Sequence, residues 1–204
     1  MANWNTVPLQ TYQGGLNAEP LSGGTPTGYY LKKYCQTAVD LRAGTASKTY
    51  HSWITFRFGE FYLNYAEAVY KYLGSPYATD SEFTTSAVDA IKVVRTRAGM
   101  PGFPQGMTND AFWKKYQNER MVELAFEGHR FWDLRRWGLA TTVLNGTHME
   151  GVKPTKVGDG YEYNVVDCDA GKTRVYLEKS IASLFLLQKF SRTLLVNSLT
   201  NGNN

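Results

Sequence analysis

The sequence predicts a mainly α-helical protein: tetratricopeptide-like helical hairpins joined by irregular loops, with a small antiparallel β-hairpin. Three observations predict this fold. Apolar residues recur at helical spacing through the middle of the chain. Gly and Pro interrupt these segments at their ends. After about residue 146 the pattern changes to short runs rich in Val and Tyr, which favour strands.

The first two helices are expected to form an antiparallel hairpin. One covers 56–73 and ends at Gly74, and its apolar face is expected to be Phe58, Phe61, Tyr62, Tyr65, Val69, Tyr72 and Leu73. The other covers 86–98, with Ser86 as N-cap and an apolar face of Ala87, Ala90, Ile91 and Val94. Small residues (Ala66, Ala68, Ala87 and Ala90) let the two axes approach closely. One such unit cannot bury both faces, so partner helices are needed.

A third helix is expected over 110–126, capped by Thr108 or Asn109, and a fourth over 129–144 after a break at Gly128. The runs 161–166 and 174–179 predict an antiparallel hairpin that turns at 169–171. An extended piece is expected over 29–39, and an apolar, helix-like tail over 181–196.

No domain boundary stands out, so residues 1–204 are expected to form a single domain. Its parts are a loop-rich segment 1–55, a helical core 56–145, a β appendage 146–180 and an atypical tail 181–204. The first ten residues have neither the basic nor the apolar region of a signal peptide. No apolar run approaches the ~20 residues of a transmembrane helix. Cys35 and Cys168 are compatible with two free thiols or with a disulfide.

The composition is that of a globular protein, with 43% apolar and 20% charged residues. The net charge is only +4 and no dense Lys/Arg tract occurs, so no nucleic-acid partner is expected. Aromatic residues are abundant, with 14 Tyr, 10 Phe and 5 Trp. They are compatible with a packed core or with surfaces that stack on sugars.

The segment NERMVELAFEGHRFWDLRRWG (118–138) crowds charges among large aromatic residues. Partly buried charges need partners, and Arg pairs with carboxylates through two hydrogen bonds. The segment therefore predicts a structural clamp at a corner between two helices, sealed by Phe126, Phe131, Trp132 and Trp137. Its charged members are Glu119, Arg120, Glu123, Glu127, Arg130, Asp133, Arg135 and Arg136. Removing the side chain of Glu123 or Arg130 is expected to destabilise the fold by a few kcal/mol.

Two other functions of this segment were weighed. Glu123 and Glu127 have the spacing of an acid and base pair, as in glycosidases. Nearby Arg residues would keep both carboxylates ionised, whereas a general acid needs a raised pKa. A metal site of Glu123, Glu127 and His129 is disfavoured because Gly128 breaks the helix before the histidine. His51, His129 and His148 are scattered and suggest no site.

The same segment resembles the hallmark sequence of the SusD/RagB family. Three further pieces agree in order: TGY and KKY at 27–34, FRFGEFYLNYAEAVYKYLG at 56–74 and AVDAIKVVRTRAGMP at 87–101. The similarity runs from about residue 28 to about residue 179. Two departures are the short length, which indicates a C-terminal fragment, and an end without the family's Pro-Ile-Pro segment.

The resemblance implies a helical, tetratricopeptide-containing lipoprotein on the outer face of the outer membrane in Bacteroidetes. Such proteins bind starch-like oligosaccharides or other nutrients and partner a SusC-like TonB-dependent transporter. They have no enzymatic activity, so no catalytic residue, cofactor or metal is expected. The signal peptide and lipobox of such a lipoprotein are not found in this chain.

No binding residue transfers from the family by motif. Because loops carry function, the ligand-binding candidates are Trp4, Asn5, Tyr12 and Asn17, although the two aromatic residues could simply pack on helices. The alternatives to a receptor are a helical-repeat scaffold for a protein partner and a glycoside hydrolase that uses Glu123 and Glu127.

Overall fold

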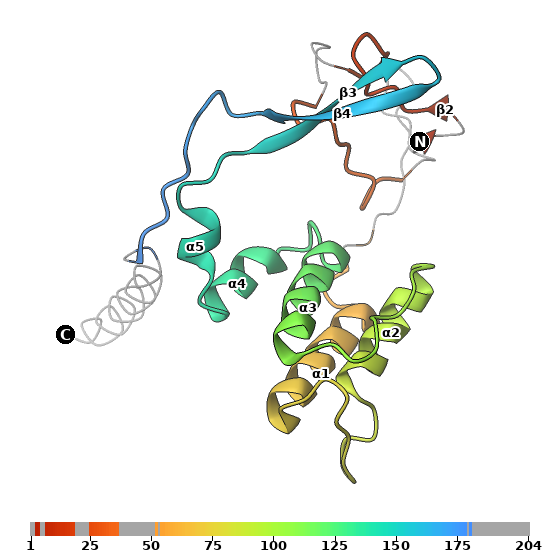
Figure 1. Ribbon diagram of the computed structural model, residues 1–204. Coiled ribbons are helices and arrows are strands. Elements are labelled where there is room, and N and C mark those ends of the chain that lie inside the picture. The colour runs from red at the N-terminus through yellow and green to blue at the C-terminus, as the bar shows by residue number, and fades with distance from the viewer. Residues whose placement is uncertain are drawn as a thin grey trace, which may run out of the picture. The chain divides into compact units, whose positions relative to one another are not determined.

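A computed structural model describes residues 3–4, 7–18, 25–36, 52, 54–178 and 180 of the chain. Within these residues the fold is mainly α-helical with a small antiparallel hairpin, as the sequence predicts (Figure 1). The chain forms two compact units, residues 50–132 and residues 1–49 with 133–204, and each is described by itself. The predicted tail over 181–196 lies outside the described residues.

The helical unit contains α1 (Phe58–Leu73), α2 (Ala87–Arg97) and α3 (Asn109–Glu123). The expected caps are confirmed: Ser86 Oγ accepts a hydrogen bond from Asp89 N at 3.2 Å, and Thr108 Oγ1 accepts one from Ala111 N at 3.3 Å. These bonds satisfy backbone donors that have no partner within a helix. Gly74 ends α1 in the left-handed conformation, with φ 73°.

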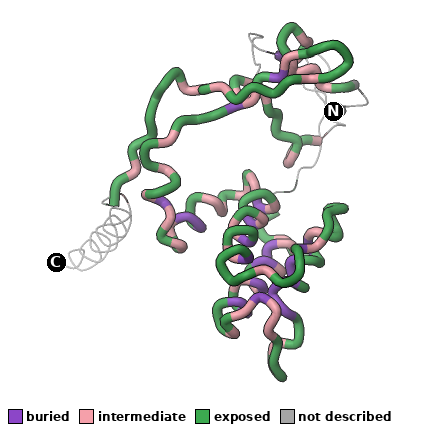
Figure 2. The backbone as a smooth tube through the Cα atoms, in the orientation of Figure 1, coloured by how far each residue is buried: buried purple, intermediate pink, exposed green. Residues whose placement is uncertain are grey.

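The core of this unit lies between the three helices, where the buried positions gather (Figure 2). The predicted apolar face of α2 is confirmed, because all four of its residues are buried. The buried face of α1 is made instead by Glu60, Leu63, Ala66, Val69 and Tyr70. From α3, Phe112 and Tyr116 are fully buried.

The predicted apolar face of α1 is buried only at Val69 and half-buried at Tyr62, Tyr65 and Leu73, and the prediction is wrong at its other three positions. Phe58 is 81% exposed and Tyr72 is 72% exposed, and Phe61 and Ala68 are also exposed. Apolar residues occupy both sides of this helix, so periodicity alone does not choose between them. Packing places the row of smaller side chains inward, where helix axes can approach closely.

The predicted fourth helix is divided into α4 (His129–Arg136) and α5 (Ala140–Leu144). Gly138 has φ 70° at the division, and Leu139 N donates to Leu134 O at 2.8 Å. This is the bond pattern of a helix that ends in a left-handed residue. The third helix also ends earlier than predicted, and Phe126 and Gly128 both have positive φ before α4 begins.

The predicted pairing of 161–166 with 174–179 is wrong. Instead, β3 (Glu150–Val157) pairs antiparallel with β4 (Gly160–Asp167) around a tight turn at Gly158 and Asp159. Pro154 lies within β3, although proline cannot donate a backbone hydrogen bond and so disfavours a strand in a sequence-based prediction. It is tolerated here because each strand of a two-stranded sheet has an open edge. Described residues 172–177 form no strand, and Arg174 instead bonds back to Gly146 and Thr147.

The N-terminal segments pack on this hairpin. Two very short strands, β1 (Asn3–Trp4) and β2 (Val7–Pro8), pair with each other. Gln13 N donates to Pro154 O at 2.8 Å, and Val152 N donates to Thr27 O at 2.9 Å. The hairpin and these N-terminal loops are therefore parts of one unit. No strand occurs over described residues 29–36, where an extended piece was expected.

Two close backbone approaches hold the segment 25–28 against β3. A Cβ at Gly28 would lie 1.9 Å from Val152 O, and one at Gly151 would lie 2.6 Å from Thr27 Cα. Only glycine allows backbones this close. Cys168 Sγ also donates to Pro26 O at 3.0 Å. Both Cys35 and Cys168 are free thiols.

Candidate functional site

Glu119 and Glu123 of α3, and Glu127 in the turn that follows, meet Arg57 just before α1 and two arginines of α2. Arg57 binds Glu127 through two hydrogen bonds of 2.7 and 2.8 Å and also pairs with Glu123. Arg97 reaches Glu123 at 2.7 Å, and Arg95 pairs with Glu119. We call this set of residues the charge lock: Arg57, Arg95, Arg97, Glu119, Glu123 and Glu127.

The charge lock is largely shielded from water. The side chains of Glu123 and Glu127 are each 12% exposed, and Arg57 is 23% exposed. The hydrogen bond with Glu127 raises the pKa of Arg57 most strongly; burial opposes this and Glu123 adds to it. Gly59 makes room for the pair, because a Cβ there would lie 2.6 Å from a terminal nitrogen of Arg57.

The remaining charged residues of the predicted clamp lie elsewhere. Arg120 is buried and donates to Asn64 Oδ1 at 2.7 Å, while Asp133 is buried and bonds Arg136 at 2.9 Å. Arg135 donates to Tyr176 OH at 2.7 Å. Arg130 is half-buried in α4. The predicted set is therefore divided between the charge lock and separate contacts.

Two of the aromatic residues that were expected to seal the clamp are largely exposed to solvent. Phe126 is 70% exposed and Trp132 is 56% exposed, and Phe131 packs edge-on against Trp132 at 5.5 Å. Phe126 has positive φ in the turn after α3, which places its side chain off the helical face that the sequence pattern implies.

The unit that contains the β-hairpin (residues 1–49 with 133–204) has a cleft lined by aromatic rings, which we call the tyrosine cleft. It is lined by Leu9, Thr11, Tyr12, Pro154, Tyr161 and Tyr163 and encloses about 150 Å³. Tyr12 and Tyr161 lie with ring centroids 5.5 Å apart and tilted by 42°. Tyr161 and Tyr163 are two residues apart on β4, so they share a face of the hairpin. Pro154 is the cross-strand partner of Tyr163 on that face.

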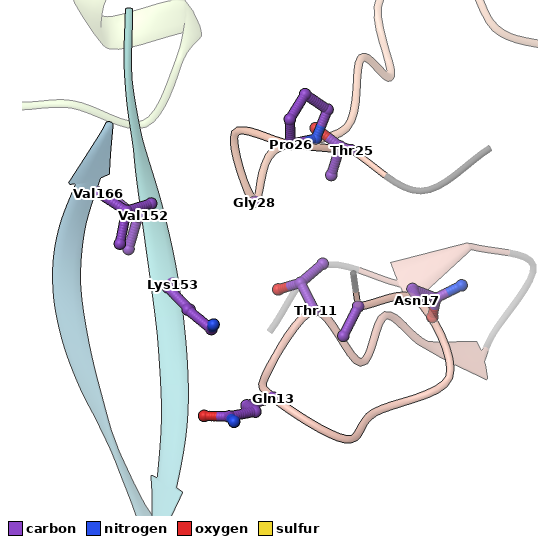
Figure 3. Close-up of a pocket in the computed structure, with 10 residues that line it drawn as sticks. Thr11, Gln13, Asn17, Thr25, Pro26, Gly28, Val152, Lys153 and Val166 are labelled. Atoms are coloured by element: carbon purple, nitrogen blue, oxygen red, sulfur yellow. The ribbon is translucent and has the colours of Figure 1, made fainter. Parts of the chain in front are cut away.

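A smaller cavity of about 30 Å³ lies between the hairpin and the N-terminal loops (Figure 3). Val152, Lys153 and Val166 line it from the hairpin, and residues of segments 11–18 and 25–28 line the other side. Thr11 contributes to both cavities. A cavity of this size holds about one water molecule, so the tyrosine cleft is the larger candidate for a ligand.

Two of the four predicted ligand residues line cavities, each a different one. Tyr12 lines the tyrosine cleft, and Asn17 lines the smaller cavity while its Oδ1 accepts from Gln10 N at 3.0 Å. Trp4 lies in β1, and Asn5 lies outside the described residues. Sequence reasoning missed Tyr161, Tyr163 and Pro154. The alternation of YEY was the available signal, because it places both tyrosines on one strand face.

The chain thus combines packed helices with a cleft that is lined by aromatic side chains of the hairpin and of an N-terminal loop. Consistent with this, the SusD family model matches residues 4–183. The chain belongs to the SusD family, whose members are nutrient- and glycan-binding proteins associated with the outer membrane. No curated protein matches the chain in a sequence comparison. Among the described residues, no helix combines the length and apolarity needed to cross a membrane.

Proposed function

We propose that this protein is a non-catalytic glycan-binding subunit of an outer-membrane uptake system, and that the tyrosine cleft contacts the sugar. The observation that carries the proposal is the grouping of Tyr12, Tyr161 and Tyr163 around one cleft. Tyrosine offers an apolar ring face and a polar hydroxyl. A pyranose ring offers matching apolar C–H faces and polar hydroxyl edges.

The size and setting of the cleft favour a chain-like ligand. Pockets for drug-sized molecules enclose roughly 300–1,000 Å³, so a cleft of about 150 Å³ suits one ring of a longer ligand. Tyr163 is 69% exposed and extends the aromatic surface into solvent. Lys153 and Gln13 are polar groups on the adjacent cavity that could bond sugar hydroxyls (Figure 3).

Isothermal titration calorimetry against a panel of soluble polysaccharides tests the proposal. We expect binding of at least one glycan, and we expect Tyr163→Ala and Tyr161→Ala each to weaken it by about tenfold or more, or ~1.4 kcal/mol. Tyr29→Ala is the control, because Tyr29 is 66% exposed and lies outside both cavities. If all three variants bind the glycan with equal affinity, the tyrosine cleft is not the site that contacts the sugar.

The contacts of Glu123 and Glu127 support a protein without hydrolase activity. Both carboxylates accept hydrogen bonds from Arg57, and neither residue lines the two cavities. A retaining or inverting glycosidase needs a protonated acid facing its substrate. Hydrolysis of a glycan that is abolished by Glu123→Gln would overturn the non-catalytic assignment.

We also propose that the protein acts with a SusC-like TonB-dependent transporter as a lipoprotein on the outer face of the membrane. Family membership supports this partner. The parent reading frame should encode a lipobox and should neighbour a gene for such a transporter. Co-purification of the two proteins from detergent-solubilised outer membranes is the direct check, and a tagged receptor that purifies without any transporter would count against it.

A scaffold for a protein partner is the second candidate, and the exposed aromatic residues of α1 favour it. Phe56, Phe58 and Phe61 lie together with ring centroids 6.4 Å apart in each neighbouring pair, and all three are exposed. Exposed apolar groupings of this kind mark interaction surfaces. If Phe58→Ser abolishes co-purification of a protein partner while no glycan binds, the scaffold function replaces the receptor function.

A further inference from the structure

The base of the β-hairpin brings together three side chains that the sequence leaves apart. His148 lies just before β3, Asp167 is the last residue of β4, and Asp169 follows in the next turn. His148 Nδ1 is 4.0 Å from Asp167 Oδ2 and 4.0 Å from Asp169 Oδ1. One ligand atom from each residue lies within 4.8 Å of the others. Two strands of one hairpin therefore converge on a His-Asp-Asp group.

Asp169 holds one oxygen of its carboxylate out of water without a protein partner. Its Oδ2 accepts a hydrogen bond from Met149 N at 2.8 Å, which fixes the orientation of the group. Its Oδ1 is buried and has no hydrogen-bond partner among the described residues. A buried carboxylate oxygen without a partner is costly, so such an atom calls for a proton donor or a cation. This atom is the one that faces His148.

Backbone N–H groups orient the carboxylate of Asp167. Asp167 Oδ1 accepts from Asp169 N at 3.0 Å, and Asp167 Oδ2 accepts from Gly171 N at 3.1 Å. These bonds fix the direction of the carboxylate, as outer hydrogen bonds do for the ligands of metal sites.

The spacing between the donors suits an ion better than a direct contact. A hydrogen bond between His148 and either carboxylate would need roughly 2.7–3.2 Å, and both distances are 4.0 Å. Two ligands that each lie ~2.1 Å from a metal can be up to about 4.2 Å apart. A small rotation of the Asp side chains brings the third donor into the same range. His148 and Asp167 are 43% and 44% exposed, which leaves room for water ligands.

We propose that His148, Asp167 and Asp169 bind a divalent cation of the Mn²⁺ or Zn²⁺ class at the base of the hairpin. One imidazole nitrogen and two carboxylate oxygens form a mixed set that suits first-row divalent metals, with water completing the coordination. The ion ties the loop before β3 to the turn after β4. It therefore strengthens the end of the hairpin where Cys168 contacts Pro26.

Manganese is the appropriate probe because the free thiols of Cys35 and Cys168 would bind zinc. The full chain, stripped with EDTA and dialysed, is titrated with MnCl₂ while the EPR signal of free Mn²⁺ is recorded. We expect one ion bound per chain. His148→Gln is expected to weaken binding by about tenfold or more. This variant should fold, because the side chain of His148 is 43% exposed and lies 4.0 Å from both carboxylates. Asp169→Asn is the second ligand variant.

Asp159→Asn is the matched control for Asp169→Asn. It also replaces one aspartate by asparagine, but at the opposite end of the hairpin. Its affinity for Mn²⁺ should equal that of the unaltered protein, and MnCl₂ should raise the melting temperature of both but not that of His148→Gln. Saturation of Mn²⁺ binding only above millimolar concentrations, or equal affinity in His148→Gln and Asp159→Asn, would overturn the site. Neither outcome depends on glycan binding.

Discussion

At the scale of single residues, Arg57 connects two acidic side chains of the helical unit. It donates to the carboxylates of Glu123 and Glu127 and to the backbone oxygen of Glu123 at 2.6 Å. Guanidinium is the side chain that can make all of these bonds at once, because its donors lie in one rigid plane. We propose that the charge lock stabilises the packing of the three helices.

Replacing Arg57 should destabilise the protein much more than replacing Arg97. Arg57→Ala leaves two largely buried carboxylates without their main partner, so we expect the free energy of unfolding to fall by about 2–4 kcal/mol. Arg97 contacts the same Glu123 but is 63% exposed, so Arg97→Ala should cost less than about 1 kcal/mol. Urea unfolding measures both. Equal losses would show that burial does not set the strength of these pairs.

Tyr116 predicts a loss of stability at alkaline pH. Its hydroxyl is buried and donates to Leu63 O at 3.0 Å or Glu67 Oε2 at 2.8 Å, and burial first, then Glu67, raises its pKa above the ordinary value of 10.0. As pH rises past that value, the unfolded chain loses the proton while the folded protein keeps it. The contribution of this hydroxyl is therefore complete below about pH 10 and declines above it.

The comparison of the unaltered protein with Tyr116→Phe isolates this effect from the other tyrosines. At pH 8 we expect the variant to be less stable by about 1 kcal/mol, because the acceptor of this hydroxyl loses its donor. Between pH 10 and 11 that difference should shrink by up to ~1.4 kcal/mol. Urea unfolding at the two pH values measures it, and a constant difference would mean that Tyr116 ionises alike in both states.

At the scale of elements, the local sequence predicts where helices form. It does not predict which face of a helix is buried or which strands pair. The caps at Ser86 and Thr108 are short-range signals, and both are confirmed. The buried face of α1 depends on partners far along the chain, and the large aromatic residues point away from them. The hairpin was misassigned because Pro154 weakened the signal of β3.

The candidate sites follow the same division. Glu123 and Glu127 are visible in the sequence as an acidic row, yet their partner Arg57 lies 66 and 70 residues earlier. Tyr12 was a candidate because it lies in a loop, whereas Tyr161 was assigned to a strand with a different partner. His148 meets Asp167 only because β3 pairs with β4 in the observed register. Contacts made by long-range pairing were therefore the part that the sequence could not supply.

The close approach of segment 25–28 to β3 predicts a specific glycine requirement. Gly28 and Gly158 both have positive φ, but only a Cβ at Gly28 would meet another backbone, at 1.9 Å from Val152 O. Alanine at either position costs about 1 kcal/mol for the backbone conformation. Gly28→Ala must also displace segment 25–28, so we expect the amide of Val152 to lose its hydrogen bond to Thr27.

Hydrogen–deuterium exchange followed by mass spectrometry measures this change in a peptide that contains Val152. We expect faster exchange there in Gly28→Ala and unchanged exchange in Gly158→Ala. If glycan binding is measurable, Gly28→Ala should also weaken it, because the displaced segment lines the cavity beside the tyrosine cleft. Equal protection of Val152 in both variants would show that the segment accommodates a side chain.

At the scale of the whole molecule, the charge lock and the candidate binding groups lie in different units. The charge lock lies within residues 50–132, and the tyrosine cleft and the His-Asp-Asp group lie within the other unit. Residues 118–132 of the segment that resembles the family hallmark lie in the helical unit, while the candidate binding chemistry lies in the other unit. Substitutions in the charge lock should therefore change stability without a direct change at the proposed binding surfaces.

This separation predicts that residues 50–132 fold when they are expressed alone. The buried residues Leu63, Ile91, Phe112 and Tyr116 and every member of the charge lock belong to this unit. We expect a helical circular dichroism spectrum and one cooperative urea transition. Arg57→Ala should lower its free energy of unfolding by the same amount as in the full chain, within about 0.5 kcal/mol, because distant sites contribute additively. A shortened protein without a cooperative transition, or a clearly different loss for Arg57→Ala, would show that the stability of the three helices depends on the other unit.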